Sequence, residues 1–212
     1  IRLEKTKNGI NPCVPYNIGV RHASGDIIVL TSPETFHTRD MFSVTNNFDK
    51  LNDNSYLMLS VFCLTKKEVK NCLHDVSIGF DRKSEEVEKI IPLFYENLGC
   101  RGYSFNNDYG SWYLHSVYRP TALNFFSVMT KKLYYEVCGF DERFRFGTGY
   151  DDEEFKIRVL SKINNNVVYF DEAVAIHVDH EIVNNAAPTS NEAVFLDTRK
   201  NIYKDNNLWG RV

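Results

Sequence analysis

The stretch Asn17-Ile-Gly-Val-Arg-His-Ala-Ser-Gly-Asp-Ile-Ile-Val-Leu-Thr-Ser-Pro-Glu34 decides the expected fold. Residues 26–31 are a compact β-branched run after a Ser-Gly turn, which predicts a buried strand. The residues that follow this strand lie at its carboxyl end, where ligands gather in α/β sheets. A carboxylate at Glu34 can therefore reach a bound ligand. The alternative is that Pro33 ends the strand and Glu34 begins a helix, whose dipole favours an acid there.

Strand and helix patterns alternate along the chain. The 212 residues, 43% of them apolar, suit one domain over 1–212. The aromatic, Gly-containing stretch 100–120 predicts a long surface loop. We therefore expect an α/β domain with helices on both faces of a central sheet. Strands are predicted at 26–31, 55–64, 123–129, 167–170 and 173–178, and helices at 38–51, 83–98, 131–137, 151–161 and 189–205.

Charge and cysteine content argue against several classes of protein. Twenty-five basic and 28 acidic residues give a net charge of −3, which offers no electrostatic footprint for nucleic acid. No apolar stretch approaches the ~20 residues that span a bilayer. The five cysteines are widely spread, without a CxxC pair, and we expect no secretory leader ahead of them. We therefore expect reduced thiols in an intracellular, cytoplasmic protein without a membrane span.

A second motif places four acids at the start of a predicted helix. It reads Cys138-Gly-Phe-Asp-Glu-Arg-Phe-Arg-Phe-Gly-Thr-Gly-Tyr-Asp-Asp-Glu-Glu-Phe-Lys-Ile-Arg158. Its Gly-x-Gly step lets the backbone pass closely under a ligand. The crowded acids should raise the pKa of at least one carboxylate, which a general base for a sugar hydroxyl can use. The alternative is a solvated, charged helix start, which makes no demand for the Gly-x-Gly step.

A third motif, His177-Val-Asp-His180, ends a predicted strand. His177 and Asp179 alternate with Val178 and so share a face, and His180 can turn in after the strand. Imidazole and carboxylate together invite a divalent metal. A non-haem iron triad would need a further histidine well downstream, and none follows His180. Surface histidines without a ligand are the alternative reading of this motif.

Together with residues 124–144, these motifs resemble the ordered landmarks of GT-A fold nucleotide-sugar glycosyltransferases over roughly residues 11–180. The most specific blocks are Gly139-Phe-Asp-Glu-Arg-Phe144 and Gly147-Thr-Gly-Tyr-Asp-Asp-Glu-Glu-Phe155. They are similar to blocks of the family-2-like and animal galactosyltransferase enzymes. A weaker similarity, to a domain of large viral glycosyltransferases, would place the protein inside a virus-infected host cell. The resemblance implies a single GT-A, Rossmann-like domain with a mixed sheet. It also implies a metal-dependent hexosyltransferase that moves a sugar from a UDP- or dTDP-type donor to a glycan or glycoconjugate hydroxyl.

The resemblance assigns a metal and donor side to the site. The family's Asp-x-Asp motif is replaced here by Ser32-Pro33-Glu34, which keeps only the last acid. Glu34 would bind Mn²⁺ or Mg²⁺ together with His177 and His180. The donor would be bound by Ser32, Asn17 and Arg21.

The resemblance also assigns the base and acceptor side. Asp152 would be the catalytic base, and Asp151 would act beside it to orient the acceptor. The expected acceptor-binding residues are Glu154, Trp112 and Gly149.

Two departures from the family pattern leave alternatives open. The first acid of the metal motif is lost, and the opening strand-helix-strand unit expected before Asn11 does not appear. Since Ile1 is not an initiator, we expect upstream residues and further domains in the same polypeptide. The alternatives are a catalytically silent nucleotide-sugar or glycan-binding domain and a metal-independent transferase.

Overall fold

Six strands form one mixed sheet in the computed structural model, which describes residues 11–37, 51–64, 111–178 and 190–198. Its order is β1 (Ile27–Thr31), β5 (Phe126–Thr130), β3 (Tyr56–Leu64), β6 (Val167–Val178) and β2 (Thr35–His37). The short strand β4 (Ser111–Leu114) pairs with the second half of β3. Strands β3 and β6 are parallel, and the other pairs are antiparallel. The expected α/β class and mixed sheet are therefore confirmed.

Most predicted strands are present, with three differences. The strands predicted at 167–170 and 173–178 are one strand, β6, because an irregularity opposite Leu59 and Ser60 absorbs the break without ending the pairing. The prediction of a loop is wrong at Ser111–Leu114, where four residues pair with β3. Strand β5 begins at Phe126, three residues after the predicted start at 123.

The two edge strands of the sheet are joined by only three residues. Strand β1 lies at one edge and β2 at the other, yet the chain passes from Thr31 to Thr35 directly. Four residues span at most about 14 Å. The sheet must therefore curl until its edges meet at this turn. In agreement, the His37 ring of β2 packs edge-on against Phe126 of β5, with 5.0 Å between the ring centroids.

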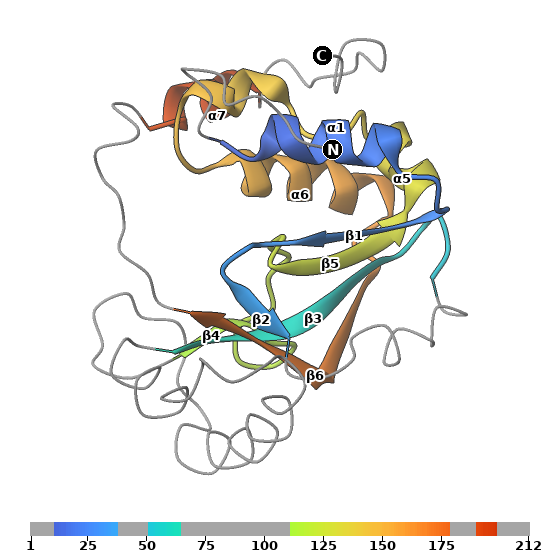
Figure 1. The fold of residues 1–212 in the computed structure, drawn as a ribbon, viewed down its shortest axis with the longest axis vertical. Coiled ribbons are helices and arrows are strands. Elements are labelled where there is room, and N and C mark those ends of the chain that lie inside the picture. Colours follow the sequence, from blue (N-terminus) through green and yellow to red (C-terminus); the bar gives the residue numbers. More distant parts are fainter. Residues whose placement is uncertain (1–10, 38–50, 65–110, 179–189, 199–212) are drawn as a thin grey trace.

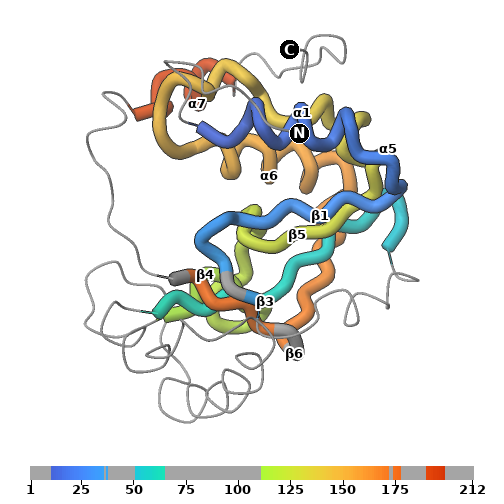
Figure 2. The backbone as a smooth tube through the Cα atoms, in the orientation of Figure 1, coloured from blue at the N-terminus to red at the C-terminus, as the bar shows by residue number. Residues whose placement is uncertain are grey.

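The described helices lie on one side of the sheet in Figure 1, and Figure 2 shows the same arrangement as a tube. They are α1 (Cys13–His22), α5 (Lys131–Glu136), α6 (Asp151–Lys162) and α7 (Glu192–Thr198). The predictions of α5 and α6 are confirmed, and α7 lies inside the range predicted for the last helix. The helices expected at 38–51 and 83–98 fall outside the described residues, apart from Leu51, which is not helical. None of the described helices has the length and apolar character needed to cross a membrane.

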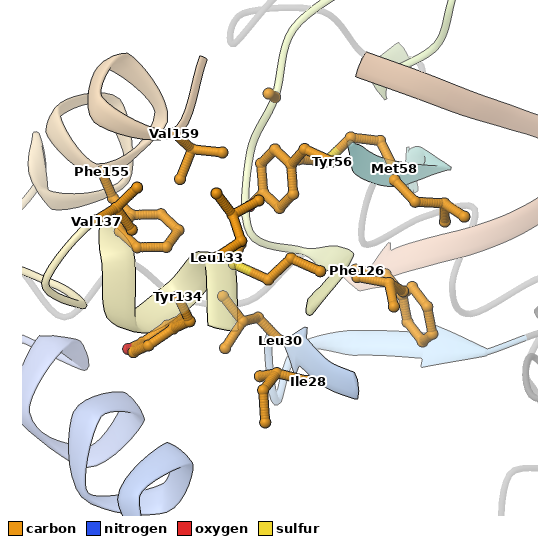
Figure 3. Close-up of a cluster of buried hydrophobic side chains, with 14 of the residues drawn as sticks. Ile28, Leu30, Tyr56, Met58, Phe126, Leu133, Tyr134, Val137, Phe155 and Val159 are labelled. Carbon is orange, nitrogen blue, oxygen red and sulfur yellow. The ribbon is translucent and has the colours of Figure 1, made fainter. Parts of the chain in front are cut away.

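The core fills the space between these helices and the sheet. In Figure 3, Phe155 and Val159 of α6 and Leu133 of α5 gather with the strand residues Leu30 and Tyr56. Burying each such side chain contributes roughly 1.5–3 kcal/mol to folding. Strand β3 is buried on both faces, which explains its continuous apolar sequence. The core thereby fixes the carboxyl end of β1 and the amino end of α6 relative to one another.

Candidate active site

The turn after β1 ties Ser32 and Glu34 into one unit. The Ser32 backbone N–H donates to the Phe125 carbonyl (3.1 Å), and the Thr35 N–H donates to the Ser32 carbonyl (3.1 Å). The Ser32 hydroxyl donates to the Glu34 carboxylate. A helix beginning at Glu34, the alternative expectation, is not formed, because the chain continues into β2. The turn therefore presents a hydroxyl and a carboxylate at the carboxyl end of β1, where only Ile28 and Leu30 are buried.

The loop before α6 is held in a left-handed conformation. Gly149 has φ 73° and Tyr150 has φ 66°, a value that costs free energy for a residue with a Cβ. The Asn191 amide holds this loop by donating to the carbonyl oxygens of Phe144 (2.9 Å) and Gly149 (3.1 Å). The Tyr150 ring packs against Phe195 of α7, with 5.2 Å between centroids. These contacts fix the position of the first turn of α6.

A pocket of about 230 Å³ joins these two regions. The sequence predicted roles for half of its wall residues: Ser32 from the turn after β1, and Gly149, Asp151 and Asp152 from the start of α6. A Cβ at Gly149 would meet no atom within 4 Å, so the space beside this residue is open. The other wall residues are Pro12, Tyr16, Asn124 and Phe125.

Burial raises the pKa of both aspartates in this pocket. For Asp152 it raises the pKa to about 6, helped by the charge of Asp151 and opposed by the Glu153 N–H, which donates to the Asp152 carboxylate at 2.9 Å. Burial also raises the pKa of Asp151, against a hydrogen bond from the Asn11 amide at 2.8 Å. The predicted rise in a carboxylate pKa is confirmed. Burial, rather than the expected crowding of charges, is its larger cause.

Tyr16 connects the pocket to β1. Its hydroxyl donates to the Thr31 carbonyl at 3.2 Å. Burial raises the pKa of this phenol to about 12, and the nearby charges of Asp151, Glu34 and Asp152 add to the effect. Tyr16 is therefore a neutral hydrogen-bond donor at physiological pH. No role was predicted for Tyr16 from the sequence, because its position one turn into α1 becomes informative only once α1 is packed beside β1.

The two donor-binding residues predicted on α1 do not line the pocket. Asn17 is fully buried, and its amide N–H groups donate to the Phe140 carbonyl and the Glu142 carboxylate, both at 2.8 Å. Its oxygen accepts from the Tyr134 hydroxyl (2.7 Å) and the Phe140 N–H (2.8 Å). These four bonds join α1 to α5 and to the segment after it. Arg21 lies half-buried in the last turn of α1 and is not a wall residue either.

Of the three predicted acceptor-binding residues, Gly149 lines the pocket and the other two are buried elsewhere. Glu154 forms a bidentate ion pair with Arg158, whose Nε and Nη2 each lie 2.6 Å from a carboxylate oxygen. Trp112 is only 2% exposed and packs edge-on against Phe62, with 5.0 Å between centroids. Both side chains stabilise the fold in these positions.

His177, a predicted metal ligand, lies among aromatic side chains on β6. It is 8% exposed, its Nδ1 is 3.7 Å from the Cys63 sulfur, and its ring contacts Tyr113 and Phe125 at centroid distances of 4.7 and 5.3 Å. His180, the second predicted imidazole, lies outside the described residues. Within the part of the chain that the structure describes, no three His, Cys, Asp or Glu side chains form a group that could hold a metal ion.

Two buried polar atoms follow the Ser32–Glu34 turn without a hydrogen-bond partner in the described parts of the chain, Thr35 Oγ1 and His37 Nδ1. Burial lowers the pKa of His37, which favours the neutral imidazole that binds metals. With Glu34, these atoms offer oxygen and nitrogen donors along one short segment. The described donors are an incomplete ligand set, because Glu34 is the only carboxylate among them.

Comparison with known proteins assigns no family to the chain. No protein-family model matches the sequence, and no curated protein matches it significantly. Function must therefore be inferred from the pocket itself.

Proposed function

We propose that the chain is a GT-A fold glycosyltransferase domain, which transfers a hexose from a UDP- or dTDP-linked donor to a hydroxyl of a glycan or glycoconjugate. One observation carries the proposal: the Ser32 hydroxyl, at the end of β1, and the Asp152 carboxylate, at the start of α6, line the same pocket. Transfer needs a group that holds the leaving diphosphate and a base for the attacking hydroxyl, one on each side of the sugar. Ser32 and Asp152 suit these two positions.

Asp152 is the general base in this proposal. A pKa of about 6 leaves its carboxylate ionised at neutral pH, yet more basic than an ordinary aspartate. It can therefore accept the proton of a sugar hydroxyl as that oxygen attacks the anomeric carbon. Asp151 beside it is held by Asn11 and would accept a hydrogen bond from a second hydroxyl of the acceptor.

The Ser32–Glu34 turn is the donor side. Glu34 is the protein carboxylate proposed for Mn²⁺ or Mg²⁺, with His177 and His180 as further ligands. When bound, the ion would neutralise charge on the leaving diphosphate. The Ser32 hydroxyl, now bonded to Glu34, would remain able to hydrogen-bond the donor. The neutral Tyr16 hydroxyl adds no charge that would repel the diphosphate.

The chemistry of the pocket walls supports a sugar ligand. Pro12, Tyr16 and Phe125 offer apolar faces, against which the C–H faces of a pyranose ring can pack. Ser32, Asn124 and the two aspartates offer hydrogen-bonding groups beside these faces. A mixture of ring-sized apolar surface and convergent polar groups is typical of small-molecule sites.

A catalytically silent nucleotide-sugar-binding domain is the second candidate. It is favoured by the bond between Ser32 and Glu34, since this bond engages the carboxylate that a cation would need. The metal-independent transferase is distinguished from both candidates by its response to chelation.

The test is turnover of a panel of UDP- and dTDP-hexoses, with glycan acceptors and with Mn²⁺, Mg²⁺ or EDTA. We expect metal-dependent hydrolysis or transfer that is lost in Asp152→Asn and kept in Asp26→Asn, a matched change at an exposed aspartate. Binding without turnover would assign the chain to the silent class, and turnover in EDTA to the metal-independent class. A folded protein that neither binds nor turns over any donor would overturn the proposal.

A further inference from the structure

Asn124 carries an amide whose oxygen is fully engaged inside the protein. The side chain is nine-tenths buried at the end of the loop that leads into β5, with a relative exposure of 9%. Its Oδ1 accepts hydrogen bonds from the Tyr56 hydroxyl (2.6 Å) and the Ser127 hydroxyl (3.3 Å). Tyr56 and Ser127 are themselves completely buried. The orientation of the amide is therefore set from within the core.

The other end of this amide faces the pocket. Asn124 is a wall residue, and the hydrogen bonds between its side chain and other described residues are all made by Oδ1. The Nδ2 nitrogen is not one of the unpartnered atoms that are sealed from solvent, so it reaches the pocket surface. In the observed orientation Oδ1 accepts from both hydroxyls, so the two N–H groups lie at the other end of the amide. These two N–H groups are the donors that Asn124 can offer to a ligand in the pocket that Ser32 and Asp152 also line.

We infer that Asn124 donates a hydrogen bond to a hydroxyl oxygen of the transferred hexose, and so selects donors that carry this hydroxyl. The inference rests on the proposed function. The Ser32 N–H bond to the Phe125 carbonyl (3.1 Å) sets Asn124 next to the donor turn, with Asp152 in the same pocket. The hexose must lie between that turn and the base.

The pocket holds both a hydrogen-bond donor, the Asn124 amide, and hydrogen-bond acceptors, the two aspartates, and this combination suits a sugar hydroxyl. Ionised Asp151 and Asp152 can only accept hydrogen bonds, whereas the free end of Asn124 can only donate. A sugar hydroxyl does both, so it can accept from Asn124 while it donates to an acceptor elsewhere. A deoxy sugar would leave the buried amide without a hydrogen-bond acceptor. A site built to bind that hydroxyl therefore discriminates strongly against the deoxy sugar.

Two variants separate sugar recognition from a purely structural role. Asn124→Asp keeps oxygens that accept from Tyr56 and Ser127, but it loses the N–H groups. Asn124→Ala removes the amide without adding charge, and the Tyr56 hydroxyl can then donate to the Ser127 hydroxyl, which lies 3.0 Å away. Asn54→Asp, at an exposed asparagine in the turn before β3, is the control for added charge. Calorimetry with Mn²⁺ would compare UDP alone with UDP-glucose and UDP-galactose, and thermal unfolding would report stability.

We expect both Asn124 variants to lose about tenfold in affinity for the UDP-sugar that binds best, relative to their affinity for UDP, while Asn54→Asp matches the wild type. Wild-type affinity for that sugar in folded Asn124→Asp would overturn the inference and leave the proposed function standing. Should Asn124→Asp not fold, the same criterion applies to Asn124→Ala. A wild-type protein that binds none of the three nucleotides would overturn the proposed function, and this inference with it.

Discussion

The amide Nδ2 of Asn11 donates to Asp151 Oδ1 at 2.8 Å, and so joins two residues 140 positions apart in the sequence. The Asn11 side chain is also fixed at its other end, because its Oδ1 accepts the Cys13 N–H at 3.0 Å. The bond lowers the pKa of Asp151 against the effect of burial. It thereby favours the charged form of Asp151, and this charge contributes to the raised pKa of Asp152. Asn11, two residues before α1, thus shapes the charge environment of both carboxylates at the start of α6.

Asn11→Ser should change the pH dependence of transfer. Serine keeps an oxygen for the Cys13 N–H but is too short to reach Asp151. Without its partner, Asp151 takes up a proton at higher pH and raises the pKa of Asp152 less. We expect the acid limb of the rate profile to move to lower pH, with a loss of up to about tenfold in maximal rate because Asp151 is less well oriented. A profile that superimposes on that of the wild type would assign Asn11 to stability alone.

Asp152→Asn should remove activity while it stabilises the fold. Loss of a general base typically costs ~10²-fold or more. The wild-type rate should fall as pH drops below about 6, since the base must be ionised, and this limb should vanish in the variant. Rate profiles from pH 5 to 8 test this expectation. A product with the donor's own anomeric configuration, seen by NMR, would contradict the base assignment.

The stability of the same variant follows from the raised pKa. Between the ordinary value of 3.8 and about 6, the folded chain binds more protons at Asp152 than the unfolded chain. Stability from this group therefore falls as pH rises through that window. At pH 8, Asp152→Asn should increase the free energy of unfolding by about 1–3 kcal/mol. Chemical denaturation at pH 8 and pH 4 measures it, and the gain should shrink at pH 4.

Glu34→Ala should abolish metal-dependent donor binding, whereas Ser32→Ala should weaken it only slightly. The reason is that Glu34 supplies the carboxylate that would bind the cation, while Ser32 would contribute one hydrogen bond to the donor. Calorimetry with UDP and Mn²⁺ distinguishes the two variants. Equal affinity in Glu34→Ala and wild type would remove Glu34 from the metal site.

Glu154→Ala should destabilise the protein by about 3–5 kcal/mol, because it leaves the Arg158 charge buried without its partner. Glu153→Ala is the matched control, since Glu153 pairs with Lys156 nearer the surface and its loss should cost less than about 1 kcal/mol. Denaturant unfolding measures both. A raised KM for the acceptor in Glu154→Ala, without loss of stability, would instead support the acceptor contact predicted from the sequence.

The sequence predicted those elements whose patterns are set locally. The apolar runs of β1 and β3 and the acid-started helix α6 follow from apolar periodicity and end signals, although β1 is buried on one face only. Strand β2 could not be predicted, because three residues carry no period and its pairing with β6 depends on the whole sheet. Strand β4 was not predicted either, because its four residues lie in an aromatic, Gly-containing stretch whose composition is typical of a loop.

The site residues that belong to sequence motifs could be predicted. Those that reach the site only through the packing of distant segments could not. Ser32 and Asp152 were chosen from sequence and share the pocket. Asn17 was chosen for the same reason, but all four of its hydrogen bonds are made inside the protein. Asn124 and Tyr16 were missed because the neighbouring sequence does not indicate whether an amide or a phenol will line a ligand pocket. Only the folded chain shows which polar groups are left unsatisfied.

The short turn between the two edge strands has a consequence for how the site forms during folding. Strand β1 must pair with β5, about a hundred residues later, while β2 pairs with β6, so the turn can take its final shape only after both distant partners have arrived. Closing such long loops is slow. The Ser32–Glu34 turn should therefore be among the last parts of the molecule to become ordered, and a nascent chain released before β6 is made would carry the donor residues but no assembled pocket.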